Sequence, residues 1–182
     1  GRKTLPATTM AELIAYLKAN PNKLSATSVG TASIGRFCGM FIQKQTGTSF
    51  QFVPYRGGAP AVADIVAGQI DMMFDAIPTM VEQVKAGKVR AVATSGRARS
   101  AILPDVPTVA EGGVAGYEAT IWLGLMAPKG TPVAIINKLN AEVAKITSNP
   151  EVRRTWGQQG TAAMTMGVDE FARYLNDDVA KW

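Results

Sequence analysis

Residues 50–87 constrain the fold most strongly, because strand and helix patterns alternate there with glycine or proline at each boundary. The apolar runs 50–53 and 70–74 predict strands, and a helical pattern follows each of them. A proline begins and a glycine ends each predicted helix, at Pro60 and Gly68 and at Pro78 and Gly87. Two strands joined by a helix are normally parallel, so both strand ends should share one edge of a sheet. Open α/β sheets bind ligands at that edge.

Three strand-to-helix turns are expected at this edge. The two within residues 50–87 bring together Tyr55, Arg56, Gly57, Gly58, Ala59 and Asp75. The third follows a strand-like run at residues 24–28 and consists of Val29, Gly30, Thr31, Ala32 and Ser33. Free backbone N–H groups and the helix dipole at such a turn favour an anion, and three hydroxyls would assist, those of Ser28, Thr31 and Ser33.

A purely structural role is the alternative for the turn at residues 28–33. Taken alone, these residues are better explained as a helix cap than as a ligand site. Nucleotide binding is rejected, because Arg36 and Phe37 stand where a P-loop requires lysine and a hydroxyl residue. The convergence of three such turns on one edge shifts the balance towards an anion-binding site.

Composition argues against several function classes. The 182 residues include no histidine, so the imidazole base of most nucleophilic hydrolases is missing. Lysine and arginine are spread along the chain without a basic block, so no nucleic-acid partner is expected. No apolar run is long enough to span a bilayer. We predict no metal and no cofactor, and we interpret the single Cys38 as a small core residue.

The pattern changes along the rest of the chain. Thr9 and Glu12 form a capping box before an amphipathic helix. Residues 89–94 predict a strand, and residues 117–127 predict a buried parallel strand because their middle is strongly apolar. Helical patterns then dominate to the end. We therefore place a domain boundary near residues 118–121.

Five segments, in order, resemble one family: residues 27–31, 53–61, 67–75, 103–111 and 127–132. The chain resembles, over essentially its whole length, the extracytoplasmic solute receptors of tripartite tricarboxylate transporters, the Bug family. The resemblance implies a type II-like Venus-flytrap fold of class α/β with a mainly parallel sheet. It also implies a periplasmic receptor, without enzymatic activity, that captures a small carboxylate for membrane permease subunits. Such ligands include di- and tricarboxylates, amino acids and aromatic acids.

The same resemblance assigns candidate ligand-binding residues. They are Ser28, Val29, Gly30, Thr31, Ala32, Ser33, Tyr55, Gly57, Gly58, Ala59 and Asp75. The chain departs from the family pattern at Ala32, where glycine is frequent, and at Arg36, where histidine is frequent. Arg36 would add a cation for a carboxylate, although a surface position is favoured for it.

The resemblance also predicts an incomplete two-lobed protein. Residues 1–120 would form the second lobe, and residues 121–182 would form the C-terminal part of the first lobe. The chain begins without a methionine or signal sequence, so we expect a processed or shortened form. We expect the C-terminal segment to pack atypically, to exchange with a neighbouring molecule, or to self-associate and so hide the apolar residues 121–126.

Two other functions stay open from the sequence. A small α/β enzyme would use Asp75 as a base and Arg56 as an electrophile on an anionic metabolite. A ligand sensor would need the same closing cleft as a transport receptor, so the sequence does not separate sensing from transport. Asp75 is explained equally well as a turn or cap residue ahead of Pro78.

Overall fold

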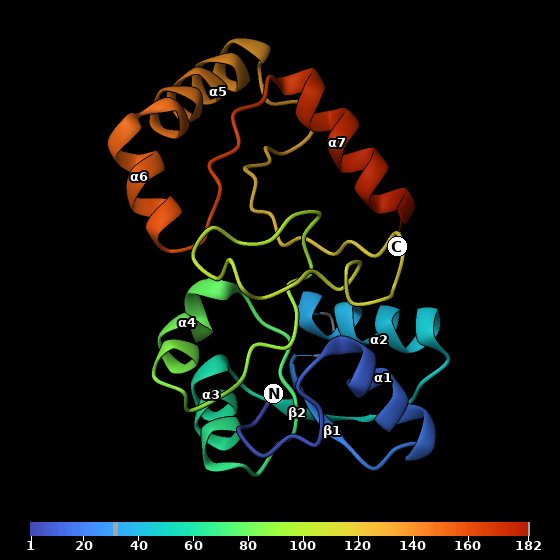
Figure 1. Cartoon of the computed structure of the whole chain (residues 1–182). Coiled ribbons are helices and arrows are strands. Elements are labelled where there is room, and N and C mark those ends of the chain that lie inside the picture. The colour runs from blue at the N-terminus through green and yellow to red at the C-terminus, as the bar shows by residue number, and fades with distance from the viewer. Residues whose placement is uncertain (31–32, 182) are drawn as a thin grey trace. The chain divides into compact units, whose positions relative to one another are not determined.

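The computed structural model describes residues 1–30 and 33–181 (Figure 1). The chain divides into two compact units, one spanning Gly1–Ile121 and the other beginning at Trp122. Within the described residues, no helix is both long and apolar enough to cross a membrane.

The first unit is built on two parallel strands, β1 (Ser25–Val29) and β2 (Gln51–Tyr55). Their register places Ala26 beside Phe52 and Val29 beside Tyr55. Both predicted strands are confirmed, and β2 continues two residues beyond its predicted end. Pro54 is tolerated within β2 because this strand has a described neighbour on one side only, so its missing N–H interrupts no second ladder.

The predicted strand at residues 70–74 is reduced to one parallel bridge between Met72 and Ala26. Met72 donates its N–H to the Ser25 carbonyl at 3.0 Å and accepts the N–H of Thr27 at 3.0 Å. The Ser25 N–H, in contrast, bonds the Asp71 carboxylate at 2.8 Å. A side chain therefore takes the place of a ladder bond, and the pairing stops at Met72.

Two further strand predictions were wrong. Residues 89–94 form only isolated bridges, Val89 with Arg2 and Thr94 with Thr108. Residues 117–127 form no strand, and beyond the buried Tyr117 and Ala119 the segment is not buried, with Leu123 97% exposed. Strand assignment requires a hydrogen-bonded neighbour, and no described residue provides one for residues 120–127.

Four helices accompany the strands of the first unit, with α1 and α2 on one side and α3 and α4 on the other (Figure 1). Their bounds are α1 (Met10–Ala19), α2 (Ile34–Thr46), α3 (Gly58–Ala67) and α4 (Ile77–Lys85). The capping box of Thr9 and Glu12 is confirmed. Gly68 ends α3 in the left-handed conformation, as its position in the sequence predicted, and Gly47 ends α2 in the same way.

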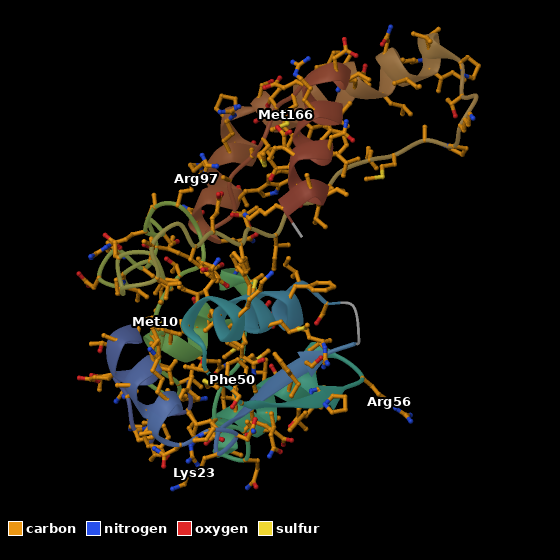
Figure 2. The ribbon with its side chains drawn as sticks, turned by 90° about the vertical axis from the view of Figure 1, so that its right-hand side faces the viewer. Met10, Lys23, Phe50, Arg56, Arg97 and Met166 are labelled. Atoms are coloured by element: carbon orange, nitrogen blue, oxygen red, sulfur yellow. The ribbon has the colours of Figure 1, made fainter. Side chains whose placement is uncertain are left out.

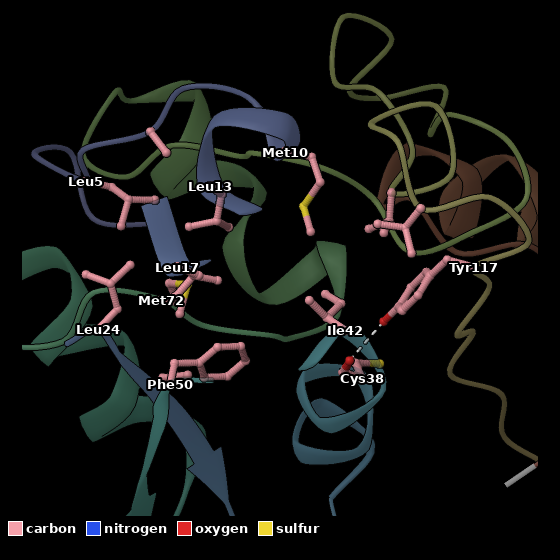
Figure 3. Close-up of a cluster of buried hydrophobic side chains, with 14 of the residues drawn as sticks. Leu5, Met10, Leu13, Leu17, Leu24, Cys38, Ile42, Phe50, Met72 and Tyr117 are labelled. Carbon is pink, nitrogen blue, oxygen red and sulfur yellow. Dashed lines mark hydrogen bonds between the residues drawn. The ribbon is translucent and has the colours of Figure 1, made fainter. Parts of the chain in front are cut away.

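The core of this unit lies between α1, α2 and the strands (Figure 3). Leu17, Ala26 and Phe50 are almost completely buried there. Cys38 belongs to the same cluster, which confirms its interpretation as a core residue. Its carbonyl accepts the Tyr117 hydroxyl at 3.0 Å, so a residue near the end of the unit is tied to α2.

The second unit is helical, as predicted. It contains α5 (Val133–Ser148), α6 (Pro150–Gln158) and α7 (Val168–Lys181). Asn149 caps α6, accepting the N–H groups of Glu151 and Val152. Trp122 packs edge-on against Phe171 of α7, with the ring centroids 5.7 Å apart.

Truncation of the core should destabilise the first unit strongly. Leu17→Ala removes a side chain that is 1% exposed, and we expect a loss of about 2–5 kcal/mol in the free energy of unfolding. Chemical denaturation measures it. Val66→Ala on α3 is the control, because Val66 is 37% exposed and its truncation should cost far less. Equal costs for the two variants would contradict the core described above.

Candidate functional site

One backbone bond and one side-chain bond hold the residues that follow β1. Gly30 has φ of +80°, a left-handed conformation that favours glycine, and its N–H donates to the Tyr55 carbonyl at 3.3 Å. The buried Ser28 hydroxyl donates to the Gly30 carbonyl at 2.8 Å. Its proton is therefore used inside the turn, leaving only lone pairs for another group.

The start of α2 continues this turn. Ser33 is the N-cap residue, and its hydroxyl accepts the Arg36 N–H at 3.3 Å. Ser33 therefore caps α2, which is the structural role that the sequence offered as an alternative to ligand binding. Thr31 and Ala32, also predicted as site residues, lie outside the described residues.

The turn after β2 leads into α3 without a side-chain cap. Gly57 is the N-cap residue, and no side chain caps the first turn of α3, which begins with Gly58 and Ala59. The first N–H groups of a helix have no partner within the helix. Arg56 is exposed, and its side chain extends away from the rest of the unit (Figure 2). This orientation does not suit the electrophile role considered for Arg56.

Tyr55 is held by a residue that the sequence pattern did not single out. Its hydroxyl donates to the Asp64 carboxylate at 2.7 Å. Burial, followed by the hydrogen bond and negative charge of Asp64, raises the pKa of Tyr55 to about 12. The contact joins β2 to α3, so neither strand nor helix periodicity reveals it.

Asp75 lies where residues 70–74 meet α4. Its Oδ1 accepts the Ala76 N–H at 2.8 Å, while Ala76 itself is the N-cap residue of α4. The residue is exposed overall, but partial burial of the carboxyl raises its pKa above the usual value, and the Ala76 N–H offsets part of this effect. Asp75 therefore forms a hydrogen bond within the turn that precedes α4, although it is not the N-cap residue of α4.

The described parts of the three turns lie close together. The bond between Gly30 and Tyr55 joins the first turn to the second. Gly35, in the first turn of α2, packs directly against the Phe74 carbonyl, next to Asp75. The adjacency expected from parallel strands is therefore present.

Arg36 is a further residue at this edge. Its guanidinium lies 4.9 Å from the centroid of the Phe52 ring, an arrangement that favours a cation. Arg36 is half-buried, so the surface position favoured from the sequence describes it only in part. Phe52 and Arg36 belong to different elements, and no local pattern links them.

Two depressions described in the first unit lie away from these turns. One, of about 220 Å³, lies between α1, the end of α2 and residues 113–115. The other, of about 340 Å³, is lined by Lys3, Arg90 and apolar residues. Among the described residues, no group of three or more acidic or cysteine side chains is arranged to hold a metal ion.

Comparison with known proteins identifies the family. A model described as "Tripartite tricarboxylate transporter family receptor" matches residues 1–182. The chain belongs to this receptor family. A UPF0065 protein from the ttuE-ttuC' intergenic region of Agrobacterium vitis is 38% identical over 168 residues, which are 92% of this chain and 49% of that protein. The family consists of solute-binding receptors. This does not support the alternative function, an enzyme with Asp75 as base and Arg56 as electrophile.

Solved receptors share the fold over the whole chain. An R. palustris protein solved with adipate has a TM-score of 0.91 and 30% identity, covering 100% of this chain and 60% of that one. MatC from Rhodopseudomonas palustris, solved with bound malate, has a TM-score of 0.89 and 29% identity, covering 100% and 63%. These similarities confirm the periplasmic-binding-protein fold class. The chain spans about half the length of the curated relatives it matches.

The contact between Tyr55 and Asp64 predicts a late tyrosine ionisation. Tyr55 keeps its proton in the folded chain above its ordinary pKa of 10.0, so the stability from this group is complete below about pH 10 and is lost as pH rises towards 12. Ultraviolet titration of the chain and of Tyr55→Phe gives the Tyr55 signal by difference. Asp64→Asn should lower the pKa of Tyr55. An unchanged value would mean that Asp64 contributes nothing to it.

Proposed function

We propose that the chain is the ligand-binding part of a periplasmic receptor that captures a small carboxylate for a tripartite tricarboxylate transporter. The membrane permease subunits of that transporter are its proposed partners. The observation that carries the proposal is the match of the entire chain to receptors solved with adipate and with malate. Both ligands are small dicarboxylates, and both relatives belong to the same fold class. Periplasmic location follows the family.

The three turns supply the chemistry that such a ligand requires. The starts of α2 and α3 carry partial positive charge, and a carboxylate accepts N–H donors at such positions. Gly57, Gly58 and Ala59 begin α3 without a side-chain cap, and small side chains there let a ligand approach the backbone. The Tyr55 ring forms a wall whose hydroxyl is already bound to Asp64. Asp75 accepts a hydrogen bond from a ligand hydroxyl or repels a ligand of the wrong charge.

Ligand capture would close the site from both sides. In a two-lobed receptor the opposite lobe closes over the ligand and completes its hydrogen bonds. In this proposal residues 28–30, 33, 57–59 and 75 would supply one wall of such a cleft. We therefore expect the 182-residue chain to bind carboxylates weakly or not at all, and a protein of the relatives' full length to bind them well.

A thermal-shift screen on this protein extended to the relatives' length tests the ligand class. Dicarboxylates should raise the melting temperature in proportion to the logarithm of ligand concentration, because they bind only the folded state. Adipate and malate are the first ligands to screen, followed by aromatic acids and amino acids. The neutral diamide of adipic acid is the matched control and should give no shift. Stabilisation by phosphate esters or nucleotides, with none by any carboxylate, would refute the proposal.

Removal of one N–H donor at the start of α3 tests the binding mode. Gly58→Pro deletes the N–H at the first helical position, where proline is well tolerated, and Gly57 before it already has an extended conformation. A hydrogen bond to a charged group contributes about 1.5–3 kcal/mol. The carboxylate affinity of the protein extended to the relatives' length, measured by calorimetry, should therefore fall about ten- to hundredfold. Gly58→Ala keeps the N–H and meets no atom within 4 Å, so it should bind nearly as well. Equal affinities for the two variants would exclude this donor.

A further inference from the structure

Arg36 is the third residue of α2, and its side chain lies on the ring of Phe52, a residue of β2. The central carbon of the guanidinium is 4.9 Å from the ring centroid. Gly39, one turn further along α2, packs on the same ring so closely that a Cβ atom there would lie 2.7 Å from a ring carbon. Phe52 therefore lies beneath the first two turns of α2, and Arg36 contacts it from the turn that begins the helix.

The positive charge of Arg36 meets no carboxylate among the described residues. Arg2, which is half-buried as Arg36 is, forms an ion pair with Asp71 at 3.0 Å. Asp75, at the same edge as Arg36, accepts the Ala76 N–H and makes no ion pair with this guanidinium. A guanidinium carries five N–H donors, and those of Arg36 reach no acceptor in the described part of the chain.

A guanidinium held on a ring is well suited to a carboxylate ligand. The contact with Phe52 restricts where the charge lies, so less conformational freedom of Arg36 is lost when a ligand binds. The planar guanidinium donates two parallel N–H bonds to one carboxylate, which fixes the orientation of that group as well as its charge.

The guanidinium and the start of α3 belong to opposite sides of the strands. Arg36 extends from α2, on one side of β1 and β2, whereas α3 lies on the other side (Figure 1). Residues 57–59 begin α3 without a side-chain cap. A carboxylate that accepts the first N–H groups of α3 therefore leaves the Arg36 guanidinium for a second anionic group.

We propose that Arg36 is a specificity-determining residue, which binds the second carboxylate of a dicarboxylate ligand. The start of α3 takes one carboxylate and the Arg36 guanidinium takes the other. The receptor then prefers a dicarboxylate to a ligand of the same length that carries one negative charge. This inference rests on the proposed function and adds which ligands the site selects and which side chain selects them.

Calorimetry with succinate, adipate and the monoamide of each acid tests this role in the protein extended to the relatives' length. Each acid and its monoamide have the same length and differ by one carboxylate. We expect wild-type protein to prefer the dicarboxylate, and we expect Arg36→Gln to reduce the ratio of the two affinities about ten- to hundredfold, because only the dicarboxylate loses a charged contact. A variant that folds less completely would bind both ligands more weakly by the same factor, so the ratio separates recognition from folding.

Lys44→Gln is the matched control. It removes the same charge from an exposed position in the last turn of α2 and should keep the wild-type ratio.

Two kinds of result would overturn the inference. Carboxylate binding without a preference for the dicarboxylates, or an equal change of the ratio in Arg36→Gln and Lys44→Gln, would overturn the role of Arg36 and leave the proposed receptor function standing. An unchanged ratio in Arg36→Gln would do the same. Wild-type protein that binds no carboxylate at all would overturn the proposed function and this inference together.

Discussion

Strand β1 is the element on which the first unit depends, because it is hydrogen-bonded on both sides. It pairs with β2 along its length and with Met72 at a single bridge. Ala26, the second residue of β1, is fully buried. The chain leaves β1, β2 and the Met72 segment at the same edge, and three helices begin shortly beyond it. Any ligand site built from these turns therefore inherits its geometry from one five-residue strand.

A polar contact fixes the third segment where the ladder is short. Asp71 accepts the Ser25 N–H and hydroxyl, both at 2.8 Å, and forms an ion pair with Arg2 at 3.0 Å. The Asp71 side chain is only 14% exposed, and a carboxylate at that depth requires such partners. Together with the single backbone bridge at Met72, this contact sets the direction of residues 71–75. Asp75 reaches the common edge because Asp71 is anchored to the start of β1.

Local signals predicted the helices, whereas the strands required partners that local signals do not reveal. Thr9, Ser33, Gly47 and Asn149 define helix ends through bonds within a few residues, which is why local sequence signals indicate helix ends. Residues 89–94 and 120–127 have strand-like composition but lack a continuous bonded neighbour among the described residues. An apolar run indicates that a segment is able to form a strand. The segment becomes a strand only when a neighbouring strand supplies hydrogen bonds.

The same distinction applies to the candidate site. Connection rules for parallel strands predicted that the turns at Gly30, Gly57 and Asp75 would meet, and this required no side-chain contact. The pair of Tyr55 and Asp64 and the stacking of Arg36 on Phe52 depend on side chains from different elements. No periodicity within one segment encodes such pairs. Sequence reasoning therefore predicted that the turns of the candidate site lie close together, and it missed the side-chain contacts next to them.

A site built from backbone donors has a consequence for charge. N–H groups and helix dipoles stabilise an anion without a full positive charge, so several must converge on one ligand. Under the proposed function, Arg36 adds the formal cation on this side of the cleft, and the Phe52 ring restricts where its guanidinium lies. Asp75 places a negative group at the same edge. A dicarboxylate can satisfy both only if its charges lie towards the starts of α2 and α3, with any hydroxyl towards Asp75. Under the proposed function, the arrangement would therefore select for the position of charge on the ligand as well as for its sign.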